Sequence, residues 1–255
     1  MLLAIDVGNT ETAIGLFDER GELIRHWRVS TRDDHTADEK MIEIDSILAI
    51  DAFSISDISG IILSSVVPRC TRSYGEMAKR LLNRDPLIVG PDNISGLKIE
   101  YDRPNEIGAD RLVNSLAALR LFESPLIIVD FGTATTFDVV SKKGAYRGGL
   151  IAPGLEISAQ ALFDTAAKLS KVELIAPDNI IGSDTVSSIQ SGLIYGTAAM
   201  VDGVVEKIVS DTGKTYNVIA TGGISKKIAI HCRTVSKIEP LLTLLGLQMI
   251  YEDSR

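Results

Sequence analysis

Two stretches of the chain repeat one pattern of apolar and polar positions. Residues 2–6 form an apolar run that ends in an aspartate, and two further strand-like segments, 12–17 and 22–30, follow across short polar turns. The pattern begins again at residues 126–130, an apolar run that ends in Asp130. Each stretch predicts a three-stranded antiparallel meander.

Helices and strands are expected to alternate after each meander. Apolar residues recur with helical spacing at 36–50 and 69–82, which predicts two helices, one before and one after an apolar strand at 60–66. A short strand is expected at 87–89. After the second meander, a long helix is predicted at 183–210, a strand at 217–220 and a closing helix at 241–249.

An internal duplication explains both stretches. Asp6 and Asp130 lie 124 positions apart, whereas the turn glycines Gly21 and Gly144 lie 123 apart, so the meanders align with a slip of one residue. We expect an α/β protein of two lobes with one topology, residues 1–115 and 116–255.

Composition narrows the class of protein. Of 255 residues, 45% are hydrophobic and only 5% aromatic, which favours the aliphatic interior of an α/β fold. The net charge of -8 has the wrong sign for broad binding to nucleic acid.

Cys70 and Cys232 are far apart, so neither a disulfide scaffold nor a structural zinc site is indicated. Because no signal peptide or membrane-spanning run is recognisable, a cytoplasmic location without membrane contact is expected.

The turn after the first apolar strand is a candidate phosphate site, with the sequence Asp6-Val7-Gly8-Asn9-Thr10. Glycine lets the backbone approach an oxyanion, neighbouring N–H groups form an anion-binding nest, and the aspartate can hold a neutralising cation. A plain hairpin turn has the same composition. The second meander repeats the arrangement as Asp130-Phe131-Gly132-Thr133, which favours a clamp for phosphate and metal in a cleft between the lobes.

Two other motifs are chemically ambiguous. Thr221-Gly222-Gly223 follows an apolar strand and suits a flat adenine or ribose, or is an ordinary turn. Gly108-Ala109-Asp110-Arg111 opens a helix and offers a base beside an anion clamp, or is a surface ion pair. Since no P-loop, dinucleotide fingerprint or nucleophilic triad is recognisable, direct phosphoryl transfer is the favoured chemistry.

Together these motifs resemble the type III pantothenate kinases, a bacterial family of the actin and sugar-kinase superfamily. The resemblance covers nearly the whole chain and rests on five segments in the family's order: Asp6–Thr10, Gly108–Arg111, Asp130–Thr136, Gly148–Leu155 and Thr221–Gly223. It implies duplicated ribonuclease H-like lobes, each a mixed sheet with a three-stranded meander and flanking helices. It also implies phosphorylation of pantothenate by ATP, the first step of coenzyme A biosynthesis.

The resemblance also implies a set of site residues. ATP would contact Asp6, Val7, Gly8, Asn9, Thr10, Glu11, Thr12, Ala13, Thr133, Gly222 and Gly223. Pantothenate would contact Tyr101, Gly108, Ala109, Asp110, Arg111 and Thr185. Asp110 would be the general base and Asp130 the ligand of a monovalent cation, K⁺ or NH₄⁺, while Asp6 is a candidate ligand for the Mg²⁺ that accompanies ATP.

Family members are homodimers with composite substrate sites, so the resemblance implies a homodimer here. Two alternatives remain open from the sequence. One is a non-enzymatic relative that acts as an accessory transcription factor, against which intact Asp110 and both phosphate turns argue. The other is a different small-molecule enzyme of the superfamily, such as a sugar kinase or an exopolyphosphatase, because a fold alone does not fix a substrate.

Overall fold

The computed structural model describes residues 1–165 and 171–255, which form two compact units. Unit 1 contains Met1–Ala117 together with Leu242–Arg255, and unit 2 contains Ala118–Leu241. The first division, between Ala117 and Ala118, falls within the helix that the sequence predicts to open at Gly108–Arg111. The units differ from the expected lobes 1–115 and 116–255 at the C-terminal segment, which packs with unit 1.

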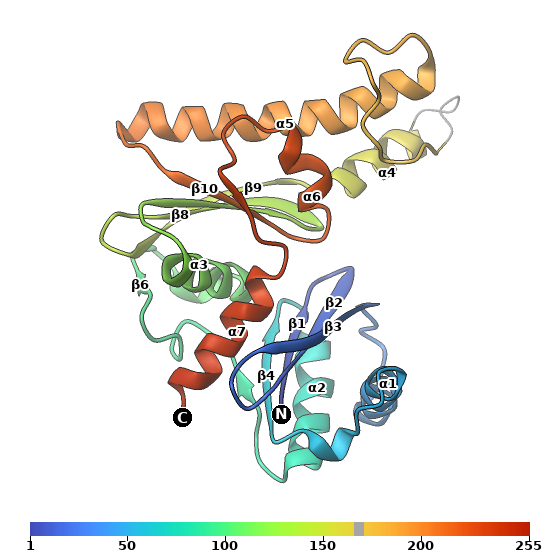
Figure 1. Cartoon of the computed structure of the whole chain (residues 1–255), viewed down its shortest axis with the longest axis vertical. Coiled ribbons are helices and arrows are strands. Elements are labelled where there is room, and N and C mark those ends of the chain that lie inside the picture. The colour runs from blue at the N-terminus through green and yellow to red at the C-terminus, as the bar shows by residue number, and fades with distance from the viewer. Residues whose placement is uncertain (166–170) are drawn as a thin grey trace. The chain divides into compact units, whose positions relative to one another are not determined.

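Unit 1 is built on a five-stranded sheet in the order β3-β2-β1-β4-β5 (Figure 1). The strands are β1 (Leu2–Val7), β2 (Glu11–Phe17), β3 (Leu23–Ser30), β4 (Gly60–Ser65) and β5 (Leu87–Ile88). The first three form the predicted antiparallel meander, while β4 is parallel to β1 and β5 is parallel to β4. Short elements η1 (Ile55–Asp57), β6 (Lys98–Ile99) and η2 (Pro104–Glu106) lie in the connections.

Helices cover both faces of this sheet because successive side chains of a strand point to opposite sides. Leu3 and Ile5 of β1 belong to one core with α1 (Ala37–Ile50) and α2 (Pro68–Leu82). On the other face, α7 (Leu242–Asp253) packs against β1, β2 and β4. A Cβ at Gly15 would lie 3.2 Å from Leu244 of α7, so a glycine there keeps the helix close to the strand.

Unit 2 repeats this plan. Its strands are β7 (Leu126–Phe131), β8 (Ala134–Val140), β9 (Ala145–Pro153), β10 (Asn217–Thr221) and β11 (Lys237–Ile238). Their order is β11-β10-β7-β8-β9, with β7, β8 and β9 antiparallel and with β10 parallel to both β7 and β11. Since β7 to β11 correspond to β1 to β5, the predicted duplication and shared topology are confirmed.

The register explains the slip of one residue between the two repeats. In unit 1, Val7 pairs with Thr12, so four residues form the turn between β1 and β2. In unit 2, Phe131 pairs with Thr135, and three residues form the equivalent turn. The second turn is therefore one residue shorter than the first.

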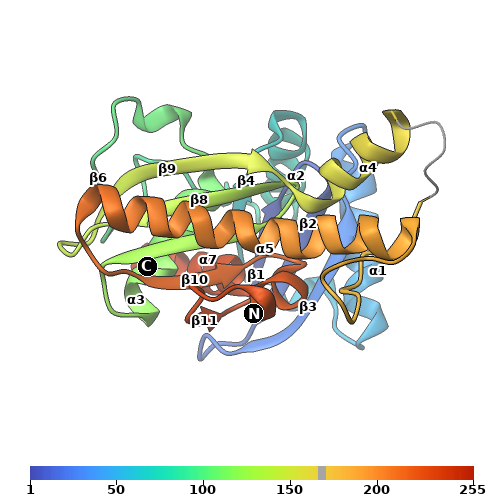
Figure 2. The ribbon, with the colours of Figure 1, turned by 90° about the horizontal axis from the view of Figure 1, so that it is seen from above.

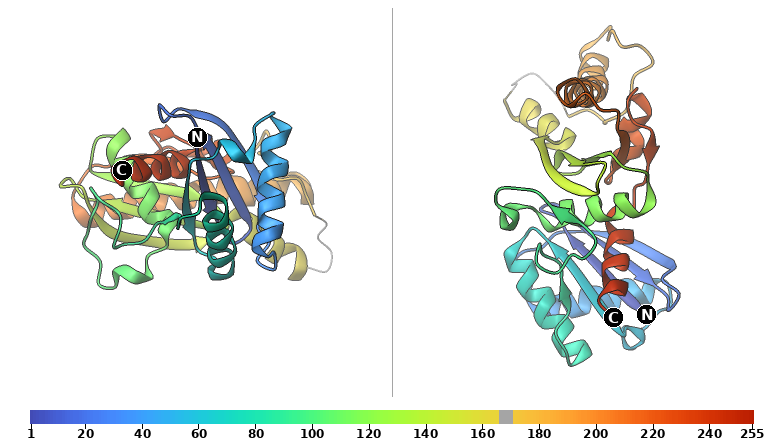
Figure 3. Two further views of the ribbon diagram at one scale, coloured as in Figure 1. Left: turned by 90° about the horizontal axis from the view of Figure 1, so that it is seen from below. Right: turned by 90° about the vertical axis from the view of Figure 1, so that its left-hand side faces the viewer.

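The helices of unit 2 lie over the face of the sheet that Ile127 and Val129 share (Figures 1 and 2). α5 (Thr185–Thr212) lies over the sheet and runs roughly along its strands, as Figures 1 and 2 show, and the right panel of Figure 3 shows α4 (Leu155–Thr165) beside it. The short α6 (Ser225–Ile228) and η3 (Ala229–His231) follow β10, and α3 (Ala109–Leu121) crosses the border between the units. α5 begins two residues later than predicted because Asp184 caps it, accepting a 2.9 Å bond from the N–H of Ser187.

No helix in the described residues is long and apolar enough to cross a membrane.

Candidate functional site

The first candidate turn, between β1 and β2, is closed by its own backbone. The N–H of Gly8 donates to the carbonyl of Glu11 at 3.0 Å, and a Cβ at Gly8 would lie 2.9 Å from that oxygen. This close approach requires glycine. Asn9 and Thr10 at the tip are exposed, whereas Thr12 is fully buried. The tip can therefore meet a ligand, but the side chain of Thr12 faces the interior.

The second turn has the equivalent closure, a 3.1 Å bond from the N–H of Gly132 to the carbonyl of Ala134. The start of α4 adjoins it, because the N–H of Gly154 donates to the carbonyl of Thr133 at 3.2 Å. A Cβ at Gly154 would lie only 2.5 Å from the carbonyl oxygen of Gly132. The Gly148–Leu155 segment therefore lies directly beside the second turn.

The Thr221-Gly222-Gly223 turn meets the second turn from the other side. β10 is parallel to β7 with Thr221 opposite Asp130, so the two strands end at the same edge of the sheet and the turns that follow them lie there. Gly222 has φ +96°, and a Cβ there would collide with the Asp130 carboxylate and lie 2.6 Å from the carbonyl oxygen of Phe131. Two motifs 90 residues apart thus form one site within unit 2.

A buried hydroxyl accompanies each of the two strand-end aspartates. Ser64 lies opposite Asp6 in the pairing of β1 with β4, as Thr221 lies opposite Asp130. Both hydroxyl-bearing residues are 0% exposed, and among the described residues neither hydroxyl oxygen has a hydrogen-bond partner. The duplication therefore places the same pair of oxygen donors at equivalent points of both units.

Asp110 stands in the first turn of α3, folded back on its own backbone. Its Oδ1 accepts a 2.8 Å bond from the N–H of Arg111, and a Cβ at Gly108 would collide with that oxygen. Burial raises the pKa of Asp110, while the Arg111 N–H and guanidinium act in the opposite direction. A carboxyl with a raised pKa near a helix start is suited to accept a proton at neutral pH.

The Gly108–Arg111 segment lies near the first turn within unit 1. The N–H of Val66, which follows β4, donates to the carbonyl of Val7 at 3.1 Å. Val66 Cγ1 also lies 3.5 Å from the position of a Cβ at Gly108. One residue therefore connects the predicted phosphate turn with the helix that carries the predicted base.

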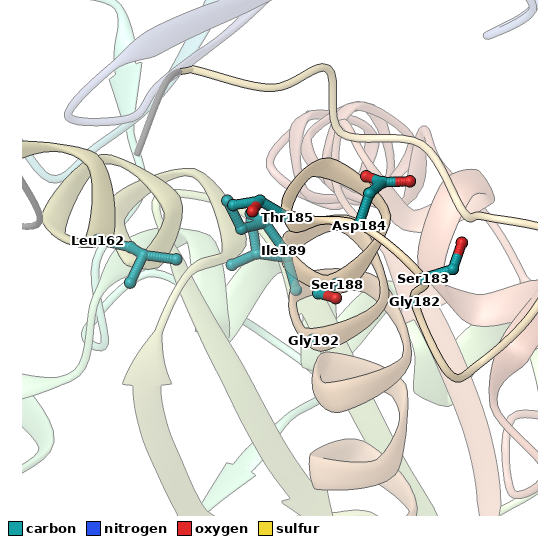
Figure 4. Close-up of a pocket in the computed structure, with 9 residues that line it drawn as sticks. Leu162, Gly182, Ser183, Asp184, Thr185, Ser188, Ile189 and Gly192 are labelled. Carbon is teal, nitrogen blue, oxygen red and sulfur yellow. The ribbon is translucent and has the colours of Figure 1, made fainter. Parts of the chain in front are cut away.

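Thr185 belongs to unit 2, where it lines a pocket of about 610 Å³ between α4 and the start of α5 (Figure 4). Figure 4 shows Leu162 on one side of this pocket and Thr185, Ser188 and Ile189 on the other. The adjoining N-cap residue Asp184 has a lowered pKa, chiefly because the backbone N–H of Ser187 stabilises the carboxylate. Tyr101, the remaining predicted substrate contact, is 40% exposed and precedes η2 in unit 1.

The described residues contain no cluster of three or more His, Cys, Asp or Glu side chains able to enclose a metal ion. Mg²⁺ needs no such cage when a nucleotide is bound, since one or two carboxylates and the phosphates suffice. In unit 2, the Asp130 carboxylate and the Phe131 carbonyl gather at Gly222, next to the Thr221 hydroxyl. This set of hard oxygen donors fits a cation.

Comparison with known proteins agrees with the motifs. Residues 2–207 match the family model for type III pantothenate kinase. The chain belongs to the type III pantothenate kinase family. A type III pantothenate kinase of Desulfosudis oleivorans is 45% identical over 251 residues, covering 98% of both chains. Another, from Halalkalibacterium halodurans, is 43% identical over 254 residues and covers both chains completely.

Solved structures extend the likeness in fold alone. A Campylobacter jejuni protein of the Baf family of transcriptional activators aligns with a TM-score of 0.62 at 18% identity, covering 99% of this chain and 98% of its own. Component A of the (R)-2-hydroxyglutaryl-CoA dehydratase from Acidaminococcus fermentans aligns with a TM-score of 0.59 at 13% identity, covering 100% of this chain and 99% of its own. Both structures share the fold of this chain, with its duplicated mixed sheets, over nearly its whole length.

Sequence reasoning left several neighbours of the site without a role. Gly154 closes against the second turn, and Ser225 Oγ donates to the Gly222 carbonyl at 2.7 Å, fixing the glycine turn. The Pro153-Gly154 pair, which stands just before α4, was the signal in the sequence that could have indicated the contact of Gly154 with the second turn. Nothing in the sequence distinguishes Ser225 from ordinary polar residues, and the position of Thr221 opposite Asp130 depends on the pairing of β10 with β7.

Proposed function

We propose that this protein transfers the γ-phosphoryl group of ATP to the primary hydroxyl of pantothenate, giving 4'-phosphopantothenate for coenzyme A biosynthesis. The observation that carries the proposal is membership of the type III pantothenate kinase family, with 45% identity across 98% of the chain. The intact turns at Gly8 and Gly132 and the partly buried Asp110, with its raised pKa, support it.

In this proposal Asp110 is the general base. The bond from the Arg111 N–H orients one carboxylate oxygen, and the carboxylate accepts the proton of the attacking hydroxyl. Arg111 offers a planar fork of donors that suits the carboxylate of pantothenate. Alignment of the hydroxyl with the phosphoryl group and neutralisation of charge supply most of the rate.

The proposed nucleotide contacts are turn residues in each unit. The N–H groups around Gly8 and the Gly132–Thr133 turn would bind phosphate oxygens, and Gly222 and Gly223 would lie beside the adenosine. The Mg²⁺ bound with ATP neutralises phosphate charge, and Asp6 is its proposed protein ligand. Asp130, among the oxygen donors at Gly222, would hold K⁺ or NH₄⁺.

A homodimer is also part of the proposal. Large apolar side chains of unit 2 are exposed in the single chain: Ile151 (67%), Ile157 (48%), Leu162 (36%), Ile180 (70%), Ile181 (84%) and Val186 (49%). They come from β9, α4, the segment before α5 and α5 itself, and Leu162 also lines the pocket that contains Thr185. Exposed apolar side chains of this kind suit contact with a second copy of the chain, through which Thr185 would reach the substrate.

A panel of hydroxylated acceptors with radiolabelled ATP tests the proposal. We expect label in pantothenate, dependence on K⁺ or NH₄⁺, and a fall in turnover of about a hundredfold or more for Asp110→Asn with ATP binding retained. Preferential labelling of a sugar would assign the chain to another kinase activity. No transfer to any acceptor would favour the non-enzymatic alternative, and unchanged turnover of Asp110→Asn would remove Asp110 from the role of base.

A further inference from the structure

A chain of polar contacts runs from the interior of unit 1 to the first turn. At its inner end, Lys40 is 0% exposed, its Nζ lies 3.1 Å from a carboxylate oxygen of Glu43, and it stands 4.7 Å from the centre of the Tyr74 ring. Ionisable groups are rarely buried so completely without a partner or a role. Neither Lys40 nor Glu43 belongs to the site described above.

The chain continues through three hydroxyl groups. Tyr74 Oη donates to the same Glu43 carboxylate oxygen at 3.2 Å and also forms a hydrogen bond with the Thr12 hydroxyl. Burial, then the negative charge of Glu43, raises the pKa of Tyr74, so its hydroxyl keeps its proton. Thr12 Oγ1 lies 3.0 Å from Thr31 Oγ1, which donates to the carbonyl oxygen of Gly8 at 2.8 Å. Because Tyr74 and Thr31 donate their own protons to Glu43 and Gly8, the single Thr12 proton is shared between Tyr74 Oη and Thr31 Oγ1.

Thr31 holds two carbonyl groups of the first turn. Besides the bond from its hydroxyl to Gly8, its N–H donates to the carbonyl of Thr10 at 2.9 Å. In a trans peptide unit the C=O and the next N–H point in opposite directions. With the carbonyls of Gly8 and Thr10 directed toward Thr31, the N–H groups of Asn9 and Glu11 are directed away from it.

We propose that Thr31 and Tyr74, backed by the buried Lys40–Glu43 pair, are positioning residues for the nucleotide. They act through the peptide units of the first turn, fixing two N–H donors in the direction from which a triphosphate would be bound. This inference rests on the proposed binding of ATP at that turn. Donors fixed in advance bind an anion without an ordering cost at the time of binding.

The second turn obtains the same kind of support from backbone. There the carbonyl of Thr133 accepts its bond from the N–H of Gly154, a contact that no side-chain substitution removes. The equivalent bond in the first turn is the one from the Thr31 N–H to the Thr10 carbonyl, and the Thr31 side chain adds the bond to the Gly8 carbonyl. The effect is therefore testable by mutation at Thr31, and a nearly isosteric change is available.

The test measures KM for MgATP and for pantothenate, kcat, and the dissociation constant of MgATP by titration calorimetry. Thr31→Val removes the hydroxyl, and we expect KM and the dissociation constant for MgATP to rise about three- to tenfold, as for one lost hydrogen bond. KM for pantothenate should not change. Thr31→Ser should restore nucleotide binding, and Tyr74→Phe should weaken it in the same direction.

Thr71→Val is the matched control, because the Thr71 hydroxyl donates to the carbonyl of Val67 at 3.1 Å in α2 of the same unit. It should leave nucleotide binding unchanged. Unchanged MgATP binding in folded Thr31→Val, or equal changes in both KM values, would overturn the positioning role. If Thr31→Val fails to fold, Tyr74→Phe decides by the same criteria. A wild-type protein that bound no MgATP would instead overturn the proposed function itself.

Discussion

Replacement of Gly222 by alanine tests how the second half of the site is assembled. Gly222 has φ +96°, a conformation that costs a residue with a side chain about 1–3 kcal/mol. The new Cβ would also collide with the Asp130 carboxylate and lie 2.6 Å from the Phe131 carbonyl oxygen. Overpacking of this kind costs about 1–3 kcal/mol, so the free energy of unfolding of unit 2 should fall by about 2–6 kcal/mol.

Urea denaturation followed by circular dichroism measures this loss. The only tryptophan, Trp27, lies on β3 of unit 1, so its fluorescence reports separately on the unit that the substitution does not touch. Gly203→Ala is the control: no heavy atom lies within 4 Å of a Cβ there, and the site is inside α5. We expect it to stabilise unit 2 by about 0.5–1 kcal/mol.

The same substitution should affect cation binding, since the Asp130 carboxylate must move to admit the new methyl group. We expect the K⁺ concentration for half-maximal activity to rise in Gly222→Ala and not in Gly203→Ala. If the Gly222→Ala protein were as stable as the Gly203→Ala protein and required the same K⁺ concentration, the turn at Gly222 would not adjoin Asp130 as described.

Two further predictions concern ionisable groups. Because burial raises the pKa of Asp110, the base is lost on acidification at a higher pH than for an ordinary aspartate. We therefore expect kcat/KM to fall on the acid side at a higher pH than an unperturbed aspartate would give, and Asp110→Asn should abolish this limb of the pH profile. Asp184 caps α5 and has a lowered pKa, so its stabilising effect is present above the unfolded-state pKa and is lost as pH falls through the lowered value. Asp184→Ala should therefore reduce Tm by about 2–4 °C at pH 7 but not at pH 2. Asp184→Asn should change Tm little at pH 7.

Much of the fold was predictable because it depends on local patterns. The apolar runs before Asp6 and Asp130 and the turns that follow them indicated both meanders and the duplication. The sequence also placed a glycine at each point where the backbone comes close to another group, as at Gly8 and Gly222. Strand period and turn composition are sufficient for such inferences.

What remained unpredicted depends on contacts between distant segments. α7 packs in unit 1 because Gly246 admits Val113 of α3, whose Cγ1 would lie 2.7 Å from a Cβ there, and a lone helical glycine does not reveal its partner. The support of Gly8 by Thr31 likewise joins residues 23 positions apart through the pairing of β2 with β3. Neither contact has a periodic signature.

The placement of α7 has a consequence for synthesis of the protein. Unit 2 is one continuous segment, whereas the sheet of unit 1 receives a covering helix from residues 242–255, which follow unit 2 in the chain. Because residues 242–255 leave the ribosome after unit 2, that unit has all its own segments available while one face of β1 still lacks its helix. A nascent chain, or one shortened at its C-terminus, would expose that apolar face, and this makes the N-terminal half the more dependent on protection by chaperones.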